Sequence, residues 1–425
     1  MAILKNPTSA LHTHFFAPLT GLFVKLKTTR CCPKIPDEDW LQIGVARVLE
    51  GVKTGRDFLQ SMQAKLALPT VARFFEALKS KRRLALCREA NTGLTHSMTQ
   101  AVPDAFAAYS NLAEFDFYAS DGHAHSAAVH DAQQYSASGI TKKAKFATSH
   151  IYALNLRTHG LHHLAIADQI TRRKEHEIRT LKRLTLDQFR LGAPKGRKVL
   201  HIYDPAIVDY EMWRKLKEGG VYVLTRQKSN ASMVNCGPKR FDRADPINAG
   251  VLLDDQVGVA GTMLRHVRYR CPLKGEIYDF LTNEMTIAPG LIARIYQMRW
   301  DIEKVYDEVK NKFHEQKAWA SSPTAKTMQA QFICLTHNLM VLQEHHLNTE
   351  EGVANICEIK RKAQRLEKDR AILAAKNETL PALQEGFQRL TQRSVKYIRW
   401  LRAYLYEQAP WAAVVLALRD SYAVF

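Results

Sequence analysis

The sequence lacks the cysteine patterns that would assign a protein to a class at once. Its seven cysteines are scattered along 425 residues and include no Cys-x2-Cys pair. The absence of such pairs argues against a zinc module, and the scattered spacing argues against a disulfide framework. We therefore expect this chain to work in a reducing, cytoplasmic environment.

Long apolar runs are absent as well. A membrane-spanning helix needs about 20 consecutive apolar residues, and the best stretch near the N-terminus, Phe15 to Val24, is interrupted by Pro18 and Gly21. That stretch also has no small-residue cleavage site of the kind a signal peptide carries. We therefore expect no membrane association.

Acidic residues are few relative to basic ones. The chain carries 61 Lys and Arg against 42 Asp and Glu, which gives a formal charge of +19, and its pI is about 9.6. An excess this large implies a polyanionic partner, with nucleic acid as the first candidate and an acidic membrane as the second. At this length, two or three domains are expected.

The first hundred residues divide into two regions. Residues 1–36 contain four prolines and predict an irregular segment, whereas residues 37–105 predict helices. A helix expected at 70–80 runs into a basic cluster that includes Arg82 and Arg83. This arrangement suggests a helical module that touches DNA phosphates, although a solvated face is the usual explanation for a charge run.

From Phe115 the pattern changes to short β-prone runs and helices. The first run, FDFYAS, predicts a strand that ends in a turn at Asp121-Gly122. The elements expected after it are strands at 150–156 and 161–166, a helix at 173–190, a strand at 199–203, a helix at 211–218 and a strand at 221–224. Three successive strands before any long helix suggest an antiparallel meander.

The remaining organisation follows from composition. The domains expected after residue 105 are an α/β core at 106–228 and 276–345, a β-rich insertion at 229–275 that separates its two parts, and a helical C-terminal region at 346–425. Residues 360–402 of that last region carry twelve Lys or Arg against four acids. We expect it to contact DNA or to mediate dimerisation.

Tyr296, Arg299, Glu303 and Lys310 have a spacing that would place them on one face of a single helix. At about 100° per residue they fall within a stripe of about 60°, while the apolar residues cluster on another flank. Such a stripe suits an anion and a metal ion together. Asp307 falls on the same stripe as Glu303, so the spacing does not choose between the two carboxylates.

Two further carboxylates, Asp121 and Asp204, follow predicted strands. Carboxylates at the ends of neighbouring strands lie close together, and with Glu303 they would offer three hard oxygen ligands suited to Mg²⁺ or Mn²⁺. Two such ions could activate a water or a 3′-hydroxyl at a phosphodiester. The alternatives are that Asp121 only forms a turn and that Asp204 only starts the next helix.

The pattern Tyr-x2-Arg-x3-Glu-x6-Lys at 296–310 resembles the signature of the DDE transposases of insertion-sequence family four, and the resemblance extends over about residues 40–345. It implies an α/β fold: a ribonuclease-H-like mixed sheet with a β-rich insertion, flanked by helical regions. The catalytic, metal-binding residues that it implies are Asp121, Asp204 and Glu303, with two Mg²⁺ or Mn²⁺ ions. The DNA-binding residues that we expect are Tyr296, Arg299, Lys310, Arg82, Arg83 and Arg226.

The sequence departs from this family at three places. His123 stands where relatives usually have a small hydroxyl residue, and it could be an extra ligand, a phosphate contact or a polar loop residue. Pro205 stands where relatives often have arginine. The insertion has no tryptophan to stack a flipped base, so Tyr269 or Tyr278 could substitute.

The resemblance implies a cut-and-paste transposase that nicks the ends of an insertion sequence, passes through a hairpin intermediate and joins the freed end to target DNA. Because both ends must be cut together, we expect a homodimer on double-stranded DNA, at the bacterial nucleoid. Two alternatives stay open. One is a ribonuclease-H-like nuclease without strand transfer, and the other is a DNA-binding derivative whose metal site has decayed.

Overall fold

The computed structural model describes residues 10–30, 35–51, 57–60, 71–126, 147–167, 175–228, 231–381, 390, 393, 395–405 and 410–423. Its helices are α1 (Ala10–Leu22), α2 (Asp37–Glu50), α4 (Val71–Ala77), α5 (Lys81–Ala101), α6 (Glu177–Leu181), α7 (Leu186–Arg190), α8 (Tyr210–Glu218), α9 (Pro289–Met298), α10 (Asp301–Asp307), α11 (Pro323–Thr349), α12 (Ile356–Ala374), α14 (Val395–Leu405) and α15 (Trp411–Ala423). A π-helical turn, Glu308–Lys312, follows α10 directly.

One mixed sheet organises the molecule. Its strands are β1 (Phe115–Ser126), β2 (Ala147–Asn155), β3 (Leu161–Ala167), β4 (Lys198–Ile202), β5 (Val221–Arg226), β6 (Val234–Pro238), β7 (Val251–Val259), β8 (Thr262–Arg270) and β9 (Ile277–Thr282). The order across the sheet is β3-β2-β1-β4-β5-β9-β8-β7-β6. Strands β1, β2 and β3 form the predicted antiparallel meander, and β4 and β5 run parallel to β1. This is the ribonuclease-H-like α/β arrangement that we predicted.

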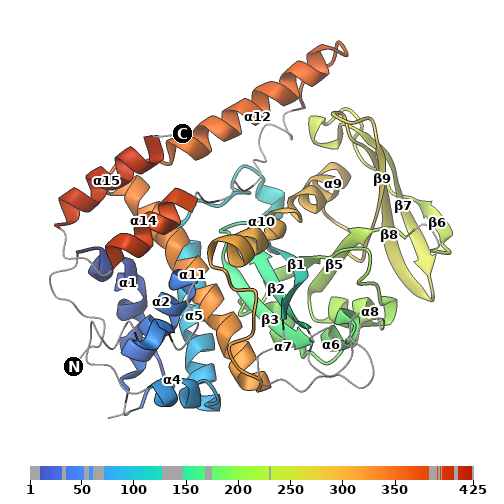
Figure 1. Cartoon of the computed structure of the whole chain (residues 1–425). Coiled ribbons are helices and arrows are strands. Elements are labelled where there is room, and N and C mark those ends of the chain that lie inside the picture. Colours follow the sequence, from blue (N-terminus) through green and yellow to red (C-terminus); the bar gives the residue numbers. More distant parts are fainter. Residues whose placement is uncertain are drawn as a thin grey trace, which may run out of the picture.

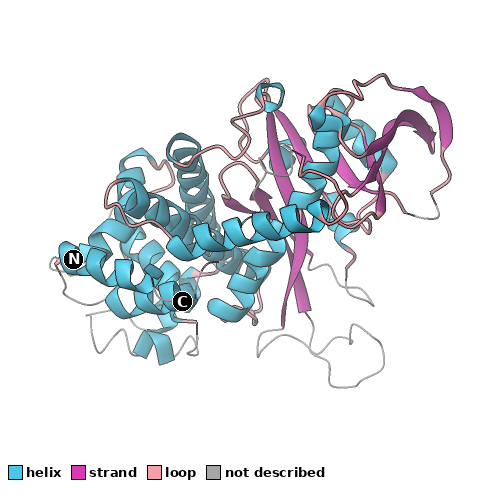
Figure 2. Cartoon of the chain, turned by 90° about the horizontal axis from the view of Figure 1, so that it is seen from above, coloured by secondary structure: helices cyan, strands magenta, loops and turns pink. Residues whose placement is uncertain are grey.

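The strands of the insertion extend this sheet instead of forming a separate one. Strand β9 pairs antiparallel with β5, and β8, β7 and β6 follow by antiparallel pairing. The alternating stretches at 251–259 and 262–269 are strands, as predicted. Seen from above, the helical bundle lies at one end of the molecule and the insertion strands at the other (Figures 1 and 2).

Alternate side chains of the central strands pack into two different hydrophobic cores. Phe117 and Ala119 of β1 belong to the core shared with α2, α5 and α11. Tyr118, between them, belongs to the second core, together with Phe189 of α7 and Trp213 of α8. Helices therefore cover both faces of the central strands. The short apolar runs in the sequence predicted such buried strands.

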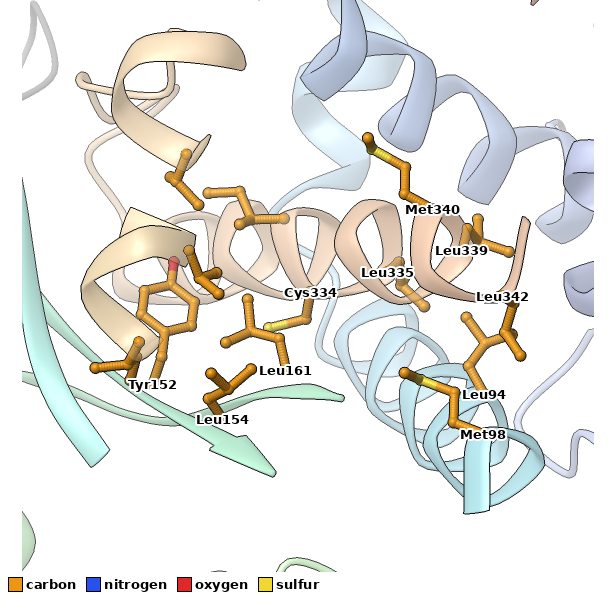
Figure 3. Close-up of a cluster of buried hydrophobic side chains, with 14 of the residues drawn as sticks. Leu94, Met98, Tyr152, Leu154, Leu161, Cys334, Leu335, Leu339, Met340 and Leu342 are labelled. Atoms are coloured by element: carbon orange, nitrogen blue, oxygen red, sulfur yellow. The ribbon is translucent and has the colours of Figure 1, made fainter. Parts of the chain in front are cut away.

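Helix α11 is the main support behind the sheet. Its residues Cys334, Leu335 and Leu339 are fully buried, and they lie between α5 on one side and β2 and β3 on the other (Figure 3). A helix that is apolar around most of its circumference must be enclosed by other elements. Because α11 packs against both the helical bundle and the sheet, it ties the two together.

Two expectations about helices are wrong. The segment 1–36, expected to be irregular, contains α1, whose Phe15, Phe16 and Leu19 are buried in the main core. The single helix expected at 173–190 is two short helices, α6 and α7, of which α7 begins anew with a capping box at Thr185; residues 168–174 lie outside the described part of the chain. Within the described residues, none of the helices is long and apolar enough to cross a membrane.

Candidate active site

Strand register brings Asp121 and Asp204 to the same level of the sheet. Strands β1 and β4 are parallel neighbours, and their last paired positions are Ala119 and Ile202. Each aspartate lies two residues beyond its member of this pair. The two carboxylates therefore project at one edge of adjacent strands, as the sequence predicted.

The turn expected at Asp121-Gly122 is absent, because β1 continues through both residues to Ser126. Asp121 pairs with Tyr152 and Gly122 with Ile151 in the ladder to β2. Glycine at position 122 is explained by a neighbour and not by a turn, because a Cβ atom there would lie 1.9 Å from Oε1 of Glu177. The glycine therefore leaves room for the Glu177 carboxylate, which any larger residue would push aside.

The segment from Tyr296 to Lys310 is not one helix. Helix α9 ends at Met298, the chain turns at Arg299 and Trp300, α10 begins at Asp301, and a π-helical turn starts at Glu308. A single stripe at 100° per residue is therefore wrong. The break has a consequence for the site, because Arg299 leaves α9 at the point where the chain passes over the two aspartates.

Arg299 joins the three carboxylates. Its Nη1 lies 3.2 Å from Asp121 Oδ2, and its Nη2 lies 3.4 Å from Glu303 Oε1 and 4.0 Å from Asp204 Oδ2. The guanidinium is only 5% exposed, and buried charges of this kind are held by partners of opposite sign. One cation thus gathers residues from β1, from the loop after β4 and from α10.

Asp307, which the spacing could not separate from Glu303, is engaged elsewhere. Its Oδ1 accepts a hydrogen bond of 2.6 Å from Asn311 Nδ2, and its Oδ2 lies 3.7 Å from Lys312 Nζ. Glu303, by contrast, contacts Arg299. The geometry therefore favours Glu303 as the third carboxylate.

The carboxyl of Asp121 has an unusual environment. Burial raises its pKa to about 6, against the Gly122 N–H and Arg299, which lower it, and Glu177 and Asp204 add to the rise. Its Oδ1 accepts a 2.8 Å hydrogen bond from Gly122 N. A carboxylate crowded by other acids in this way favours a cation among them.

The donor set suits a hard divalent cation, because all three side chains offer carboxylate oxygens. In the part of the chain that the structure describes, however, no group of three His, Cys, Asp or Glu residues is arranged to hold a metal ion. Instead, the carboxylates face the Arg299 guanidinium. The residues therefore fit a metal pair in chemistry, and Arg299 would have to move aside for Asp121, Asp204 and Glu303 to converge on it.

The residues expected to bind DNA divide into three groups. Tyr296, Arg226 and Arg299 line one cavity with Asp204. Lys310 lines a second cavity with His123 and Tyr306. The first cavity also carries aromatic rings and further polar residues, and its lining includes Tyr269, Tyr278, Phe280, Trp300 and Lys274.

Arg82 and Arg83 lie apart from both cavities. Arg82 forms two 2.8 Å hydrogen bonds with the carboxylate of Asp37. Arg83 is 7% exposed, donates to the Ile35 carbonyl and stacks over the Trp40 ring. Both guanidinium groups are engaged within the protein, so the DNA interface proposed below does not include them.

His123 and Pro205 each line one of the two cavities. His123 lies on β1, not in a loop, and its ring stacks on Tyr306 of α10 with 4.8 Å between centroids. Burial, with Lys310 nearby, lowers the pKa of His123 to about 4. Pro205 lines the cavity beside Asp204.

Two residues near the carboxylates had not been singled out from the sequence. Glu177 of α6 approaches Gly122 and accepts a 2.9 Å hydrogen bond from Ser149. Tyr306 of α10 donates its hydroxyl to the Asp121 carbonyl. A signal for Tyr306 existed, since it lies three residues after Glu303 on the same helix, but nothing local to Glu177 indicates its position.

Comparison with known proteins identifies a family for this chain. A family model described as "Transposase DDE domain" matches residues 121–339, just over half of the chain. None of the curated proteins matches the sequence. A solved structure, described as a cryo-EM structure of piggyBac transposase synaptic complex with hairpin DNA, aligns with 96% of this chain and 87% of its own at 11% identity and a TM-score of 0.37.

Proposed function

The chain belongs to the family defined by the transposase DDE domain, and on that premise we propose that it is a cut-and-paste DNA transposase of insertion-sequence family four. Members of this family cleave and transesterify DNA with divalent metal ions. The observation that carries the proposal is the contact of Arg299 with Asp121, Asp204 and Glu303 within 4.0 Å.

In this proposal Asp121, Asp204 and Glu303 hold two Mg²⁺ or Mn²⁺ ions. When bound, such a pair activates the attacking oxygen and stabilises the leaving oxygen of the phosphodiester. Arg299 takes a different role in each state. It offsets part of the charge of the three acids before DNA arrives, and it then turns to a phosphate of the substrate, for which its planar donors are well suited.

The cavity beside Asp204 is the proposed seat of the DNA end. Arg226 lies over the Tyr278 ring, 5.0 Å from its centroid, and the Tyr296 ring lies 4.9 Å from that of Phe280. Exposed guanidinium groups suit phosphates, and aromatic faces suit an unpaired base. Tyr278 is therefore our candidate for the stacking role that relatives give to tryptophan.

Helix α12 extends the proposed DNA surface. It crosses the top of the molecule from the helical bundle toward the insertion (Figure 1), and Lys376 beyond its end donates to the carbonyls of Pro272 and Leu273. Arg361, Arg365 and Lys368 are exposed on it at i, i+4 and i+7, a stripe about 60° wide. We assign the DNA contact expected of the C-terminal region to this stripe, and leave to α14 and α15 the homodimer that would bridge two ends.

The test uses a duplex copied from the inverted repeats that flank the coding sequence. The wild-type protein should nick this duplex at the repeat boundary in Mg²⁺ or Mn²⁺, not in EDTA. The freed 3′-hydroxyl of the repeat end should then attack the opposite strand and form a hairpin on that end. A pre-cut end should then join to target DNA. Cleavage without joining would indicate the nuclease, and binding without metal-dependent cleavage would indicate the decayed derivative.

A further inference from the structure

The helix that carries Glu303 is held from behind by a C-terminal segment. Asp301, at the start of α10, is fully buried. Its Oδ2 accepts a 3.0 Å hydrogen bond from Leu390 N, and its Oδ1 lies 2.9 Å from Lys304 Nζ. Lys304 in turn donates to the Leu390 carbonyl. The chain near residue 390 is thus bonded to the first turn of α10 by both of its backbone polar groups.

At the end of α10, the contact with the C-terminal residues is an ion pair. Arg393 Nη1 lies 2.5 Å from Glu308 Oε2, and its Nε lies 2.9 Å from Glu344 Oε2 on α11. Lys312 closes the π-helical turn by donating to the Arg393 carbonyl at 2.5 Å. Arg393 therefore links α11, the main support of the sheet, to the helix that carries Glu303.

These contacts lie on the face of the helix opposite Glu303. At about 100° per residue, Lys304 and Glu308 fall within about 60° of Asp301, whereas Glu303 lies about 200° round from it. One face thus meets the C-terminal segment while the other meets Arg299 and Asp121. A shift on the first face would be transmitted to the second, because a helical turn moves as a unit.

The ionic contact is closed to solvent. The side chains of Arg393 and Glu308 are 7% and 4% exposed, and His337 Nδ1 lies 2.9 Å from the other oxygen of Glu308. Burial alone would raise the pKa of Glu308, but Arg393, His337 and Lys312 outweigh it and hold that pKa at about 2. Removing Arg393 would take away the partner of Glu308 Oε2 and leave the buried carboxylate with only His337 and Lys312 to offset its burial.

The ion pair between Arg393 and Glu308 lies at the start of the π-helical turn. The N–H of Phe313 donates to the carbonyl of Glu308 at 2.9 Å, and this bond between residues five apart is the one that defines a π-helix. Such turns are rare and are often found at functional sites. Glu308 begins this turn, and Lys310, which the sequence analysis expected to bind DNA, lies within it. A cation anchored at Glu308 can therefore set the positions of both Glu303 and Lys310.

We infer that Arg393 is a positioning residue, which clasps α10 and the π-helical turn from behind so that Glu303 stands beside Asp121 and Asp204. The inference rests on the proposed function. It also assigns Leu390 and Arg393 a role in assembling the active site, separate from DNA contact or dimerisation.

The test compares Arg393→Met with Arg265→Met in the full-length protein. Arg265 is a matched control: its side chain is 2% exposed and forms two 2.7 Å bonds with Asp254, in the insertion strands. Mn²⁺ binding is followed by loss of the free-ion paramagnetic resonance signal, in the presence of the terminal-repeat duplex. Thermal melting of each variant measures the loss of stability separately.

We expect Arg393→Met to raise the Mn²⁺ concentration for half-saturation about tenfold and Arg393→Lys to restore part of it, while Arg265→Met loses stability without this shift. Equal half-saturation in all the variants, or an equal shift with Arg265→Met, would overturn the inference. If Arg393→Met does not fold, Glu344→Gln takes its place in the test. We then expect a smaller rise in the Mn²⁺ concentration for half-saturation, and no rise would contradict the inference. Absence of Mn²⁺ binding in the wild type would instead contradict the proposed function.

Discussion

The guanidinium of Arg299 lies 3.2 Å from the carboxylate of Asp121, although 178 residues separate the two in the chain. The contact joins the strand that begins the core to the helical segment that completes it. It also offsets part of the negative charge of the site before any substrate arrives, because one buried cation faces three acids.

Replacement of Glu303 by Gln should abolish cleavage while leaving binding of the terminal repeats intact. Loss of one metal-binding carboxylate should remove several kcal/mol of transition-state stabilisation, so we expect cleavage to fall about 1000-fold or more. The measurement is single-turnover nicking of a terminal-repeat duplex in Mg²⁺.

Asp307→Asn supplies the matched control for that experiment. Asp307 lies on the same helix but bonds to Asn311, so its replacement should leave nicking within about threefold of wild type. Equal losses in the two variants would remove the reason to distinguish Glu303.

Arg299 should set the pH range over which metal ions bind. Burial raises the pKa of Asp121 to about 6, and Arg299 acts in the opposite direction. As pH falls through 6, Asp121 gains a proton, so Mn²⁺ affinity should decline. With Arg299→Met the pKa of Asp121 should rise further, and this decline should begin at higher pH. Mn²⁺ titrations between pH 5 and 8 measure the midpoint.

Arg226→Met is the control for this shift, since Arg226 lines the same cavity without contacting the three carboxylates. Its midpoint should match the wild type. A midpoint that stays in place or moves to lower pH with Arg299→Met would contradict the assignment.

The basic stripe on α12 should appear in the salt dependence of DNA binding. Each phosphate contact adds about 0.9 to the slope of log affinity against log salt. Replacing Arg361, Arg365 and Lys368 by Gln should therefore reduce that slope by up to about 2.7. Binding to a terminal-repeat duplex at several salt concentrations gives the slope.

A second basic trio separates this local effect from overall charge. Arg214, Lys215 and Lys217 lie on α8, which is on the opposite side of the molecule from α12 in Figure 1. Their replacement by Gln removes the same charge and should change the slope by less than about 1. Equal changes for both trios would show that α12 acts only through net charge.

Stability should depend on pH through Glu315. Burial raises the pKa of Glu315 to about 7, against Arg47, Gln329 and Trp319, which lower it. Between the ordinary carboxyl pKa and 7, the unfolded chain releases this proton before the folded one, so the free energy of unfolding should fall as pH rises through that window. We expect a decline of up to about 3 kcal/mol, with a plateau above pH 7.

Urea titrations between pH 4.5 and 8 measure this term, and Glu315→Gln should flatten it. Glutamine keeps an acceptor for Trp319 Nε1 and Gln329 Nε2, which bond to Glu315 Oε2 at 2.9 and 2.6 Å. A variant with the same decline as wild type would place the titrating group elsewhere.

The sequence predicted the sheet better than the details of the site. Runs such as 198–202 and 221–226 are apolar because both faces of these strands are covered, so their strand character is local information. The break before α10 depends on a partner far along the chain, since Asp301 bonds to Leu390, 89 residues later. Periodicity within 296–310 cannot contain that contact.

Gly122 and Arg83 show the same limit. The glycine accommodates Glu177, and the arginine pairs with Asp37 and the Trp40 ring. From its local sequence, the glycine predicts a turn and the arginine predicts a phosphate contact. In each case contacts with residues far along the chain give the residue a different role. The resemblance to a known family supplied the three carboxylates because it carries such distant relationships implicitly.

The most direct test of the central claim is the position of Mn²⁺ in crystals of the protein bound to its terminal-repeat duplex, located by anomalous scattering. The account predicts manganese within about 2.3 Å of carboxylate oxygens from Asp121, Asp204 and Glu303, with Arg299 turned to a DNA phosphate. Manganese bound elsewhere, or Arg299 still bridging the three carboxylates with DNA in place, would contradict it.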